Sequence, residues 1–328
     1  MEEIIKKKFT KDVIESAVKK YGATYDDLIL VGNHQSYVYK VKKANDNIFI
    51  RITHVSHRDE QLILAEIEWI KHLSANSIRV AMPIKSKDNN VVELIHSEGQ
   101  IFIVVAFEEA KGKGIGQQPW SFETPKTLGF LTGQMHSISK DYRPINNNRR
   151  YTWVKNNFIS KASDYLPKEQ FKVIAELNDL VNKINKLPKD RDSYGLIHGD
   201  LVACNYHING NEITFFDFDE SCYCWYINDI AIQLFYWSLT WQGYIDKEGS
   251  YLCAKNFLEG YSRVCKLETF WLEQIPLFIR LREIILYISI YRSKNLNELD
   301  EWNMNFMDGR RERIENNIPF IDIDFSKL

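Results

Sequence analysis

Apolar residues follow two different periods in the first third of the chain. Between 59 and 73 they recur with the 3.6-residue period of a helix. On either side of this segment, short runs rich in β-branched and aromatic residues are separated by polar turns, which is typical of antiparallel strands. These runs cover residues 28–31, 37–41, 48–52, 91–95 and 101–107. A leading helix is expected from Thr10, as N-cap, to Lys20, with Gly22 as its stop signal.

The remainder of the chain has a mainly helical pattern. Helical periodicity covers residues 124–137, 168–184, 227–239, 252–261 and 269–291. Before these stretches, the segment 110–116 holds three glycines in seven residues and little that can pack, so it is expected to connect two units. The pattern therefore predicts three strands, a helix and two strands, followed by a helical part.

One non-helical segment, residues 196–219, interrupts the helical part. It contains Asn209-Gly210 between apolar runs, a strong hairpin signal because a type I′ turn needs positive φ at both central residues. With the turn there, Asn205 is predicted to lie opposite Thr214, and Asp217 about 10 Å of strand further on, at the open end. The chain reaches this end from Asp200, so the hairpin is expected to gather Asp200, Asn205 and Asp217.

These three side chains supply the groups that phosphoryl transfer needs. One carboxylate orients the attacking hydroxyl and accepts its proton, while an amide oxygen and a second carboxylate hold the Mg²⁺ that neutralises the phosphates. Taken singly, Asp200 is better explained as a turn former and Asp217 as a cap at a strand end. Taken together and in this order, they favour the catalytic interpretation.

The same residues carry a family resemblance. His198-Gly-Asp200, then Asn205, then Phe216-Asp-Phe-Asp219 resembles the catalytic and metal-binding loops of the aminoglycoside phosphotransferase and choline kinase superfamily, relatives of protein kinases. Leu131–His136 and Tyr226–Ala231 are similar to further segments of that family. Arg51–Arg58 followed by Glu66 is similar to a bacterial branch described as phosphotransferase family proteins.

The resemblance implies an α+β, protein-kinase-like fold with two lobes. Residues 1–108 would form the nucleotide-binding lobe, a five-stranded antiparallel sheet with one helix, and residues 109–328 the helical lobe that holds the catalytic loop and the acceptor. The implied reaction is transfer of the γ-phosphoryl group from ATP, with Mg²⁺, to a hydroxyl of a small molecule.

The resemblance also implies roles for individual residues. Asp200 would be the base, Asn205 a catalytic residue and metal ligand, Asp217 a metal ligand, and Asp219 either a second metal ligand or the cap of the next helix.

For the nucleotide, Arg51 would replace the usual phosphate-binding Lys and pair with Glu66. Ser36, in a loop at 32–36 that is otherwise an ordinary hairpin turn, would lie over the phosphates, and Phe107, Glu108 and Ala110 would bind adenine. His198, which also invites a general-base role, and Asp229 would brace the catalytic loop.

The acceptor pocket is expected on the helices after residue 230. Its candidate residues are Phe235, Tyr236, Trp237, Trp241, Tyr244, Arg280 and Arg282. Aromatic walls can hold a quaternary ammonium and arginines can clasp a carboxylate, so choline-like and homoserine-like acceptors are at least as plausible as polycationic aminoglycosides, which call for a cluster of carboxylates. The alternative for each aromatic residue is ordinary core packing.

Composition narrows the partners and the compartment. A formal net charge of −2 argues against nucleic-acid and membrane-surface partners, and the N-terminus lacks the pattern of a signal peptide. The five cysteines are scattered, and Cys222-x-Cys224 lacks a second pair with zinc-site spacing. A reduced, cytoplasmic protein is therefore expected, as a monomer or homodimer. Rival interpretations are a nucleotide-binding pseudokinase, a kinase acting on protein Ser/Thr, and a phosphohydrolase built on Asp217 and Asp219.

Overall fold

The computed structural model describes residues 3–33, 35–43, 46–117, 121–145, 148–240, 243–244 and 247–328. They form two compact units. The first unit contains the chain up to Lys113 together with Arg143–Arg150 and Tyr206–Asp219, and the second contains Gly114–Tyr142, Tyr151–Asn205 and Glu220–Leu328. The predicted division at residue 108 is a single cut in the sequence, whereas the chain passes between the compact units several times.

The first unit is built on an antiparallel sheet of six strands. Its strands are β1 Leu28–Gly32, β2 Tyr37–Val41, β3 Ile48–His54, β4 Pro83–Ile84, β5 Glu93–Ser97 and β6 Gln100–Glu108, in the order β1-β2-β3-β6-β4, with β5 also paired to β6. The five predicted strands are present. The sixth, β4, was not anticipated, because a two-residue strand that begins with proline carries no alternating pattern.

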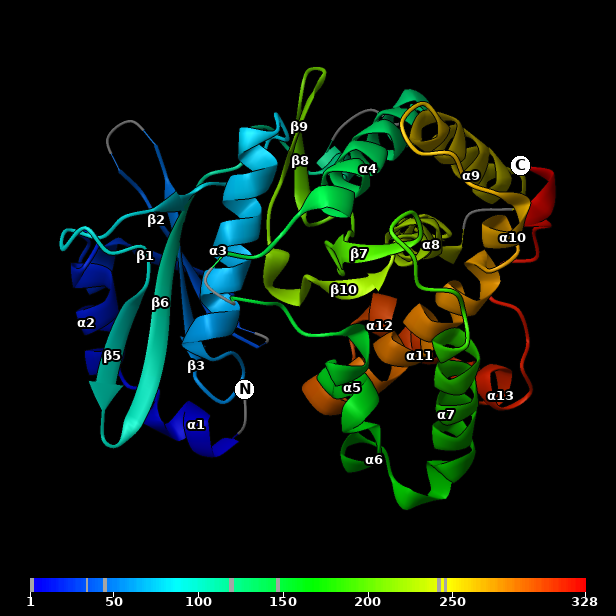
Figure 1. Ribbon diagram of the computed structural model, residues 1–328. Helices are drawn as coiled ribbons and strands as arrows, with labels where there is room; N and C mark the ends of the chain where they lie inside the picture. Colours follow the sequence, from blue (N-terminus) through cyan, green and yellow to red (C-terminus); the bar gives the residue numbers. More distant parts are fainter. Residues whose placement is uncertain are drawn as a thin grey trace. The chain divides into compact units, whose positions relative to one another are not determined.

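Helices cover both faces of this sheet, as Figure 1 shows for α2 and α3. They are α1 Glu3–Lys8, α2 Lys11–Lys19 and α3 Glu60–Ala75. Alternate residues of β6 point to opposite sides: Val104 belongs to the cluster that includes Val13 and Val18 of α2, while Ile103 packs with Ile63 of α3. The period-2 pattern of β6 thus supplies side chains to two hydrophobic clusters, one on each face of the sheet.

Two hairpins show how local sequence sets the turn. Glu98 and Gly99, between β5 and β6, both have positive φ (46° and 74°), as a type I′ turn requires. In the second hairpin, β8 Tyr206–Asn209 pairs with β9 Glu212–Phe215, so the turn is Gly210-Asn211 and not the predicted Asn209-Gly210. Gly210 has positive φ (60°), whereas Asn209 is extended in the last pair of the ladder, opposite Glu212.

The second unit is mainly helical. Its helices are α4 Glu123–Asp141, α5 Asn157–Ser160, α6 Ala162–Tyr165, α7 Phe171–Asn185, α8 Ile227–Trp237, α9 Lys247–Ser262, α10 Thr269–Leu272, α11 Ile275–Ser293, α12 Glu301–Met307 and α13 Arg310–Glu315. Its strands are β7 Tyr194–Ile197, β10 Cys222–Trp225, β11 Leu239–Thr240 and β12 Gly243–Tyr244. The helix predicted over 269–291 is two helices, because Pro276 in the first turn of α11 starts a new helix.

Short 3₁₀ turns lie between the helices and strands and near the C-terminus. They lie at Tyr25–Asp27, Ile115–Gln117, Trp153–Lys155, Lys168–Gln170, Phe218–Glu220 and Phe325–Lys327. No helix in the described ranges is both long and apolar enough to span a bilayer.

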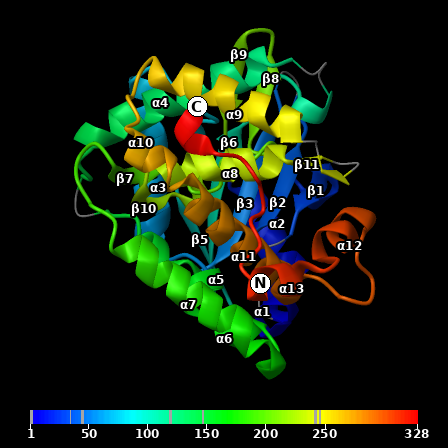
Figure 2. The ribbon, with the colours of Figure 1, turned by 90° about the vertical axis from the view of Figure 1, so that its right-hand side faces the viewer.

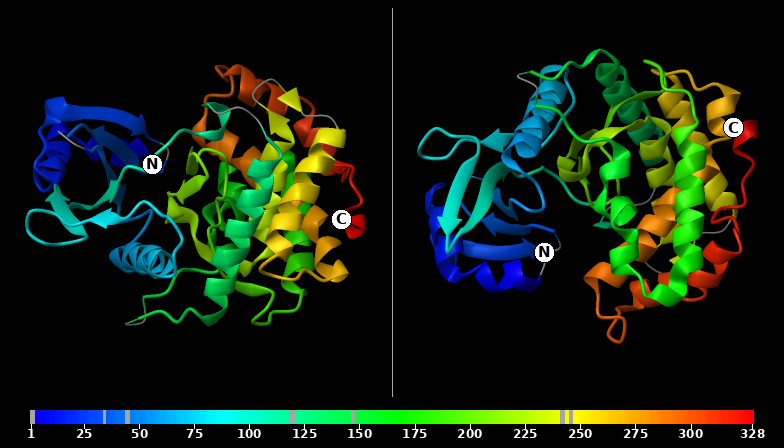
Figure 3. Two further views of the ribbon diagram at one scale, coloured as in Figure 1. Left: turned by 90° about the horizontal axis from the view of Figure 1, so that it is seen from above. Right: turned by 60° about the horizontal axis from the view of Figure 1, so that its bottom comes forward.

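Close helix contacts organise the second unit. Helices α4 and α9 run side by side, visible in Figure 3, and a Cβ at Gly129 would lie 2.0 Å from the Phe257 carbonyl oxygen. At Gly260 a Cβ would lie 1.9 Å from the carbonyl oxygen of Lys126, so neither position accepts a larger residue. Helix α11 packs against α8, and α5, α6 and α7 also contact it (Figure 2). Helix α8, residues 227–237, is therefore packed directly against α11.

Candidate active site

The segment from His198 to Asn205 follows β7 and is fixed by a buried aspartate. Asp229, in the first turn of α8, accepts hydrogen bonds from the backbone amides of His198 and Gly199, both at 2.9 Å. His136 Nε2 on α4 lies 3.3 Å from the same carboxylate. Burial opposes the charge of Asp229, but the His136 hydrogen bond and the Gly199 amide outweigh it and lower its pKa.

Gly199 makes the turn of this segment possible. Its φ is +79°, and a Cβ there would lie 2.2 Å from the carbonyl oxygen of Glu220, so only glycine fits. The Asp200 amide lies 3.4 Å from His198 Nδ1. The structure thus gives His198 and Asp229 contacts that hold the backbone leading to Asp200.

Two donors bind the Asp200 side chain. Asn205 Nδ2 donates to the Asp200 main-chain oxygen at 2.9 Å and to its Oδ2 at 3.1 Å. Arg282 Nη2 donates to Asp200 Oδ1 at 2.5 Å. The Asp200 side chain stays 25% exposed, so it is held in place yet remains open to a ligand. The Asn205 amide nitrogen thus faces Asp200, and its Oδ1 lies 3.7 Å from the Cys204 thiol sulfur.

In the first unit, Arg51 on β3 and Glu66 on α3 form a buried bidentate pair. Arg51 Nη1 and Nη2 lie 2.9 and 2.6 Å from the two Glu66 oxygens, and both residues are buried. The guanidinium also lies 5.2 Å from the centre of the Phe107 ring. Burial disfavours the charge on Arg51, but Glu66 and then Asp219 overcome this and raise its pKa.

Asp217 follows β9 in an unusual backbone conformation. Its φ is +60°, a left-handed value that aspartate tolerates better than most residues. The side chain is 54% exposed, and its Oδ1 lies 4.0 Å from Arg51 Nη1. The turn therefore presents this carboxylate to solvent next to a guanidinium.

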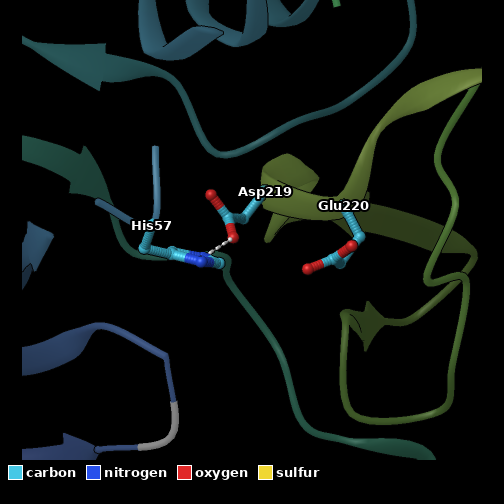
Figure 4. A group of neighbouring side chains, drawn as sticks. All are labelled: His57, Asp219 and Glu220. Atoms are coloured by element: carbon cyan, nitrogen blue, oxygen red, sulfur yellow. Dashed lines mark hydrogen bonds and ion pairs between the residues drawn. The ribbon is translucent and has the colours of Figure 1, made fainter. Parts of the chain in front are cut away.

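Asp219, two residues later, is surrounded by cationic and hydrogen-bonding side chains. His57 Nε2 lies 2.9 Å from its Oδ2, as Figure 4 shows, Arg58 Nη2 lies 3.3 Å from Oδ2, and Arg51 Nη1 lies 3.9 Å from Oδ1. Its main-chain oxygen accepts from both Arg58 and Arg150. Burial opposes the charge, but Arg58, His57 and Arg51 together hold the pKa of Asp219 well below its usual range.

This arrangement bears on the two roles that the sequence left open for Asp219. It lies inside the 3₁₀ turn Phe218–Glu220, while Tyr226 occupies the N-cap position of α8. The third side chain in Figure 4, Glu220, accepts hydrogen bonds from Tyr151 and Asn156. Sequence reasoning missed His57, Arg58 and Arg150 as partners of Asp219, because nothing in local spacing links residues 58, 150 and 219.

The other predicted nucleotide residues lie on or beside the sheet. The Ser36 hydroxyl is 2.8 Å from that of Thr53 on β3, whereas His34 of the same loop lies outside the described residues. After β6, the Glu108 amide donates to Met82 O at 2.9 Å, and the Ala110 carbonyl accepts from His207 Nδ1 at 2.8 Å. These contacts fix the segment that the sequence assigns to adenine.

Most of the described acceptor candidates pack against or hydrogen-bond to other residues of the second unit. Phe235 is fully buried, with its ring 4.3 Å from that of Phe320, and Trp237 packs on Phe257. Tyr236 binds Arg282 through its hydroxyl.

Arg280 donates to Glu176 and to the Ile314 carbonyl, both at 2.8 Å. Trp241 and the side chain of Tyr244 lie outside what the structure describes.

Comparison with known proteins gives full-length matches. Residues 28–264 match the model of the phosphotransferase enzyme family. Amicoumacin kinase of Bacillus subtilis (strain 168) is 32% identical over 331 residues, covering 99% of this chain and 98% of that protein. The structure titled amicoumacin kinase hAmiN in complex with AMP-PNP, Ca²⁺ and Ami has a TM-score of 0.92 at 30% identity over 100% of both chains. A microcompartment-associated aminopropanol kinase shares the fold, with a TM-score of 0.75 at 18% identity over 94% of this chain and 98% of its own.

Proposed function

Since the chain belongs to the phosphotransferase enzyme family and is a kinase of small-molecule hydroxyl groups, we propose that it takes the phosphoryl group from Mg·ATP and passes it to an acceptor related to amicoumacin. Family membership confirms the resemblance drawn from the motifs, and the solved structures confirm the protein-kinase-like fold. The proposal adds ATP as the nucleotide, Mg²⁺ as the metal, the identity of the acceptor and the roles of individual residues.

The observation that carries the proposal is the environment of Asp200. A general base must be ionised, oriented and accessible to the hydroxyl whose proton it takes. Asp200 has a guanidinium on one oxygen, an amide on the other, and a quarter of its side chain exposed. In the proposed reaction, the acceptor hydroxyl donates to Asp200, loses its proton there and attacks the γ-phosphorus, and ADP leaves.

Asn205 and Asp217 would hold the metal. Both offer oxygen ligands, which Mg²⁺ prefers: an amide oxygen from Asn205, and a carboxylate from Asp217, whose side chain is 54% exposed. When bound, Mg²⁺ supplies charge neutralisation at the phosphates. Asp219 is a weaker candidate, because His57 and Arg58 already bind its carboxylate. The AMP-PNP and Ca²⁺ in the related kinase support ATP and a divalent metal here.

The first unit would bind the nucleotide. Arg51, fixed by Glu66, provides a positive charge for the phosphates, and Phe107 beside it offers a ring for adenine. The Ala110 amide has no hydrogen-bond partner among the described residues and so could donate to the base, with the Glu108 carbonyl as acceptor. Ser36 would contribute from the loop before β2. Apart from Ala110, these residues lie within 1–108, the proposed nucleotide lobe, and residues 109–328 are the proposed catalytic lobe.

Contacts of four described acceptor candidates weigh against the simpler acceptors. A homoserine-like carboxylate would need a free arginine, but Arg280 is held by Glu176 and Arg282 by Asp200. A choline-like ammonium would need an open aromatic wall, but Phe235 and Trp237 are buried in the core. Full-length similarity to two amicoumacin kinases therefore gives the stronger guide.

An acceptor panel tests the proposal. Purified enzyme is incubated with Mg·ATP and amicoumacin, choline, aminopropanol, homoserine or an aminoglycoside, and ADP and phosphorylated product are measured. We expect a product 80 Da heavier than amicoumacin and little turnover of the others. Phosphorylation of another acceptor alone would refute the amicoumacin assignment while keeping the kinase. ATP binding without transfer to any acceptor would instead favour a pseudokinase.

A further inference from the structure

Arg282, on α11, binds the carboxylate proposed as the catalytic base. Its Nη2 donates to Asp200 Oδ1 at 2.5 Å and to the Tyr236 hydroxyl at 2.9 Å. The guanidinium carbon also lies 5.0 Å from the centre of the Tyr236 ring, so a hydroxyl and a π face both fix the cation. Only 15% of the Arg282 side chain is exposed. Tyr236 therefore fixes the position of the guanidinium independently of its contact with Asp200.

The two oxygens of Asp200 have different partners. Arg282 occupies part of Oδ1, and Asn205 Nδ2 approaches Oδ2 at 3.1 Å. Each carboxylate oxygen can accept two hydrogen bonds, so the pair of donors defines the plane of the carboxylate without saturating it. A hydroxyl can still donate to either oxygen. The geometry is that of a base held in one orientation, with capacity left for its substrate.

We propose that Arg282 is a positioning residue for phosphoryl transfer: it fixes the orientation of the Asp200 carboxylate, and Tyr236 fixes Arg282 in turn. The inference rests on the proposed role of Asp200 as the base. Helices α8 and α11 would then affect the reaction rate, because α8 carries Tyr236 and α11 carries Arg282. Displacement of a catalytic group by about 1 Å can cost about 10²-fold in rate.

The chain contains a matched control for this role. Arg280 lies two residues earlier on the same helix, is 12% exposed, and also binds a carboxylate, that of Glu176, at 2.8 Å. Its second contact is the Ile314 carbonyl, so its contacts do not include Asp200. Loss of Arg280 should therefore affect the fold, whereas loss of Arg282 should affect turnover.

The test compares Arg282→Ala, Arg282→Lys, Arg280→Ala and Asp200→Asn, each first shown to be folded by its melting curve. Turnover of Mg·ATP is measured with amicoumacin and, in parallel, with water as the acceptor. Arg282→Ala should lower kcat about 100-fold while KM for ATP changes less than about threefold. Arg282→Lys should retain about a tenth of the activity, because the positive charge remains and the planar fork is lost. About 20 mM guanidinium, far below denaturing concentrations, should restore activity to Arg282→Ala and not to Arg280→Ala.

A double variant separates the inference from the proposal beneath it. If both residues act through one carboxylate, adding Arg282→Ala to Asp200→Asn should cause little further loss. An inactive Asp200→Asn beside an Arg282→Ala of nearly parental kcat would overturn the positioning role and leave the base in place. Equal losses in the two arginine variants, neither relieved by guanidinium, would also overturn it. Parental turnover by Asp200→Asn would instead refute Asp200 as the base, and the inference with it.

Discussion

Asp219 in the first unit and Asp200 in the second are both bound by arginine, yet their surroundings differ in kind. Asp219 is 12% exposed, and His57, Arg58 and Arg51 all approach its carboxylate. Asp200 is 25% exposed and has one guanidinium and one amide. A carboxylate enclosed by several cations keeps little capacity for a proton or a metal, whereas one held by a single cation keeps it. The number of fixed partners therefore supports the proposed assignment of Asp200, rather than Asp219, as the base.

The same contrast appears within the Asp-x-Asp sequence. Asp217 is 54% exposed and 4.0 Å from Arg51, while Asp219 is buried under His57 and Arg58. The left-handed backbone of Asp217 turns the two side chains into different environments. Two acids that look equivalent in the sequence are therefore expected to respond differently to substitution.

The largest effect is expected from Asp200→Ala. Loss of a general base typically costs about 10²–10⁴-fold in rate, and kcat should fall by that amount. ATP affinity should stay within a few-fold, because the role proposed for Asp200 is to bind the acceptor hydroxyl and not the nucleotide. Steady-state kinetics and calorimetric titration with ATP measure the two quantities. Asp179→Ala, which removes an exposed i,i+4 partner of Lys183, is the control and should change neither. An Asp200→Ala enzyme with parental kcat would place the base elsewhere.

A second prediction concerns the buried pair of the first unit. Arg51→Ala leaves Glu66 buried without the guanidinium that it binds, and should lower the free energy of unfolding by about 3–5 kcal/mol. Arg79→Ala removes an ion pair of the same type with Glu212, but both side chains are about half exposed, so the loss should be about 0.5 kcal/mol. Urea unfolding of the two variants compares them directly. Equal losses would mean that burial of the Arg51 pair has no special effect.

Much of the fold follows from local patterns. Asp59 was the first residue of the predicted helix, and as N-cap of α3 its side chain accepts from the Leu62 amide. The strands β5 and β6 also follow from their β-branched and aromatic residues, and Gly99 suits the positive φ of the turn between them. What the sequence could not give were contacts between distant segments, such as β7 with β10, which pairs Ile197 with Cys222.

The site shows the same division. Spacing within 198–219 predicts Asp200, Asn205 and Asp217 as site residues, because they fall within one short segment that contains a hairpin. It gave no sign that Arg282 binds Asp200 from 82 positions away, or that Arg150 binds the backbone of Asp219. The hairpin register was wrong because Asn209 fits an extended strand as well as a turn. Partners supplied by tertiary packing leave no periodic signal.

A smaller effect is expected from Asp219→Asn. This variant should lose about 1–3 kcal/mol of stability at pH 7, since the cations around residue 219 lose their counter-charge. The folded-state pKa of Asp219 is depressed, so its contribution is full above the ordinary aspartate pKa of about 4 and disappears as the pH falls through the folded value. The stability difference between parent and variant should be constant from pH 7 to about 5 and shrink below about 4. Urea midpoints at several pH values measure it, and a difference that grew with acid would contradict the assigned charge state.

Asp217, and not Asp219, is proposed to be the carboxylate that binds the metal. Calorimetric titration with ATP, with and without Mg²⁺, tests this assignment. The parent should bind ATP more tightly with the metal. Asp217→Asn should lose that enhancement without a change in melting temperature, because its side chain is exposed. Asp219→Asn, measured at a temperature where it is folded, should keep the enhancement. If Asp217→Asn kept the magnesium enhancement, or if Asp219→Asn alone lost it, the assignment of the metal carboxylate would be contradicted.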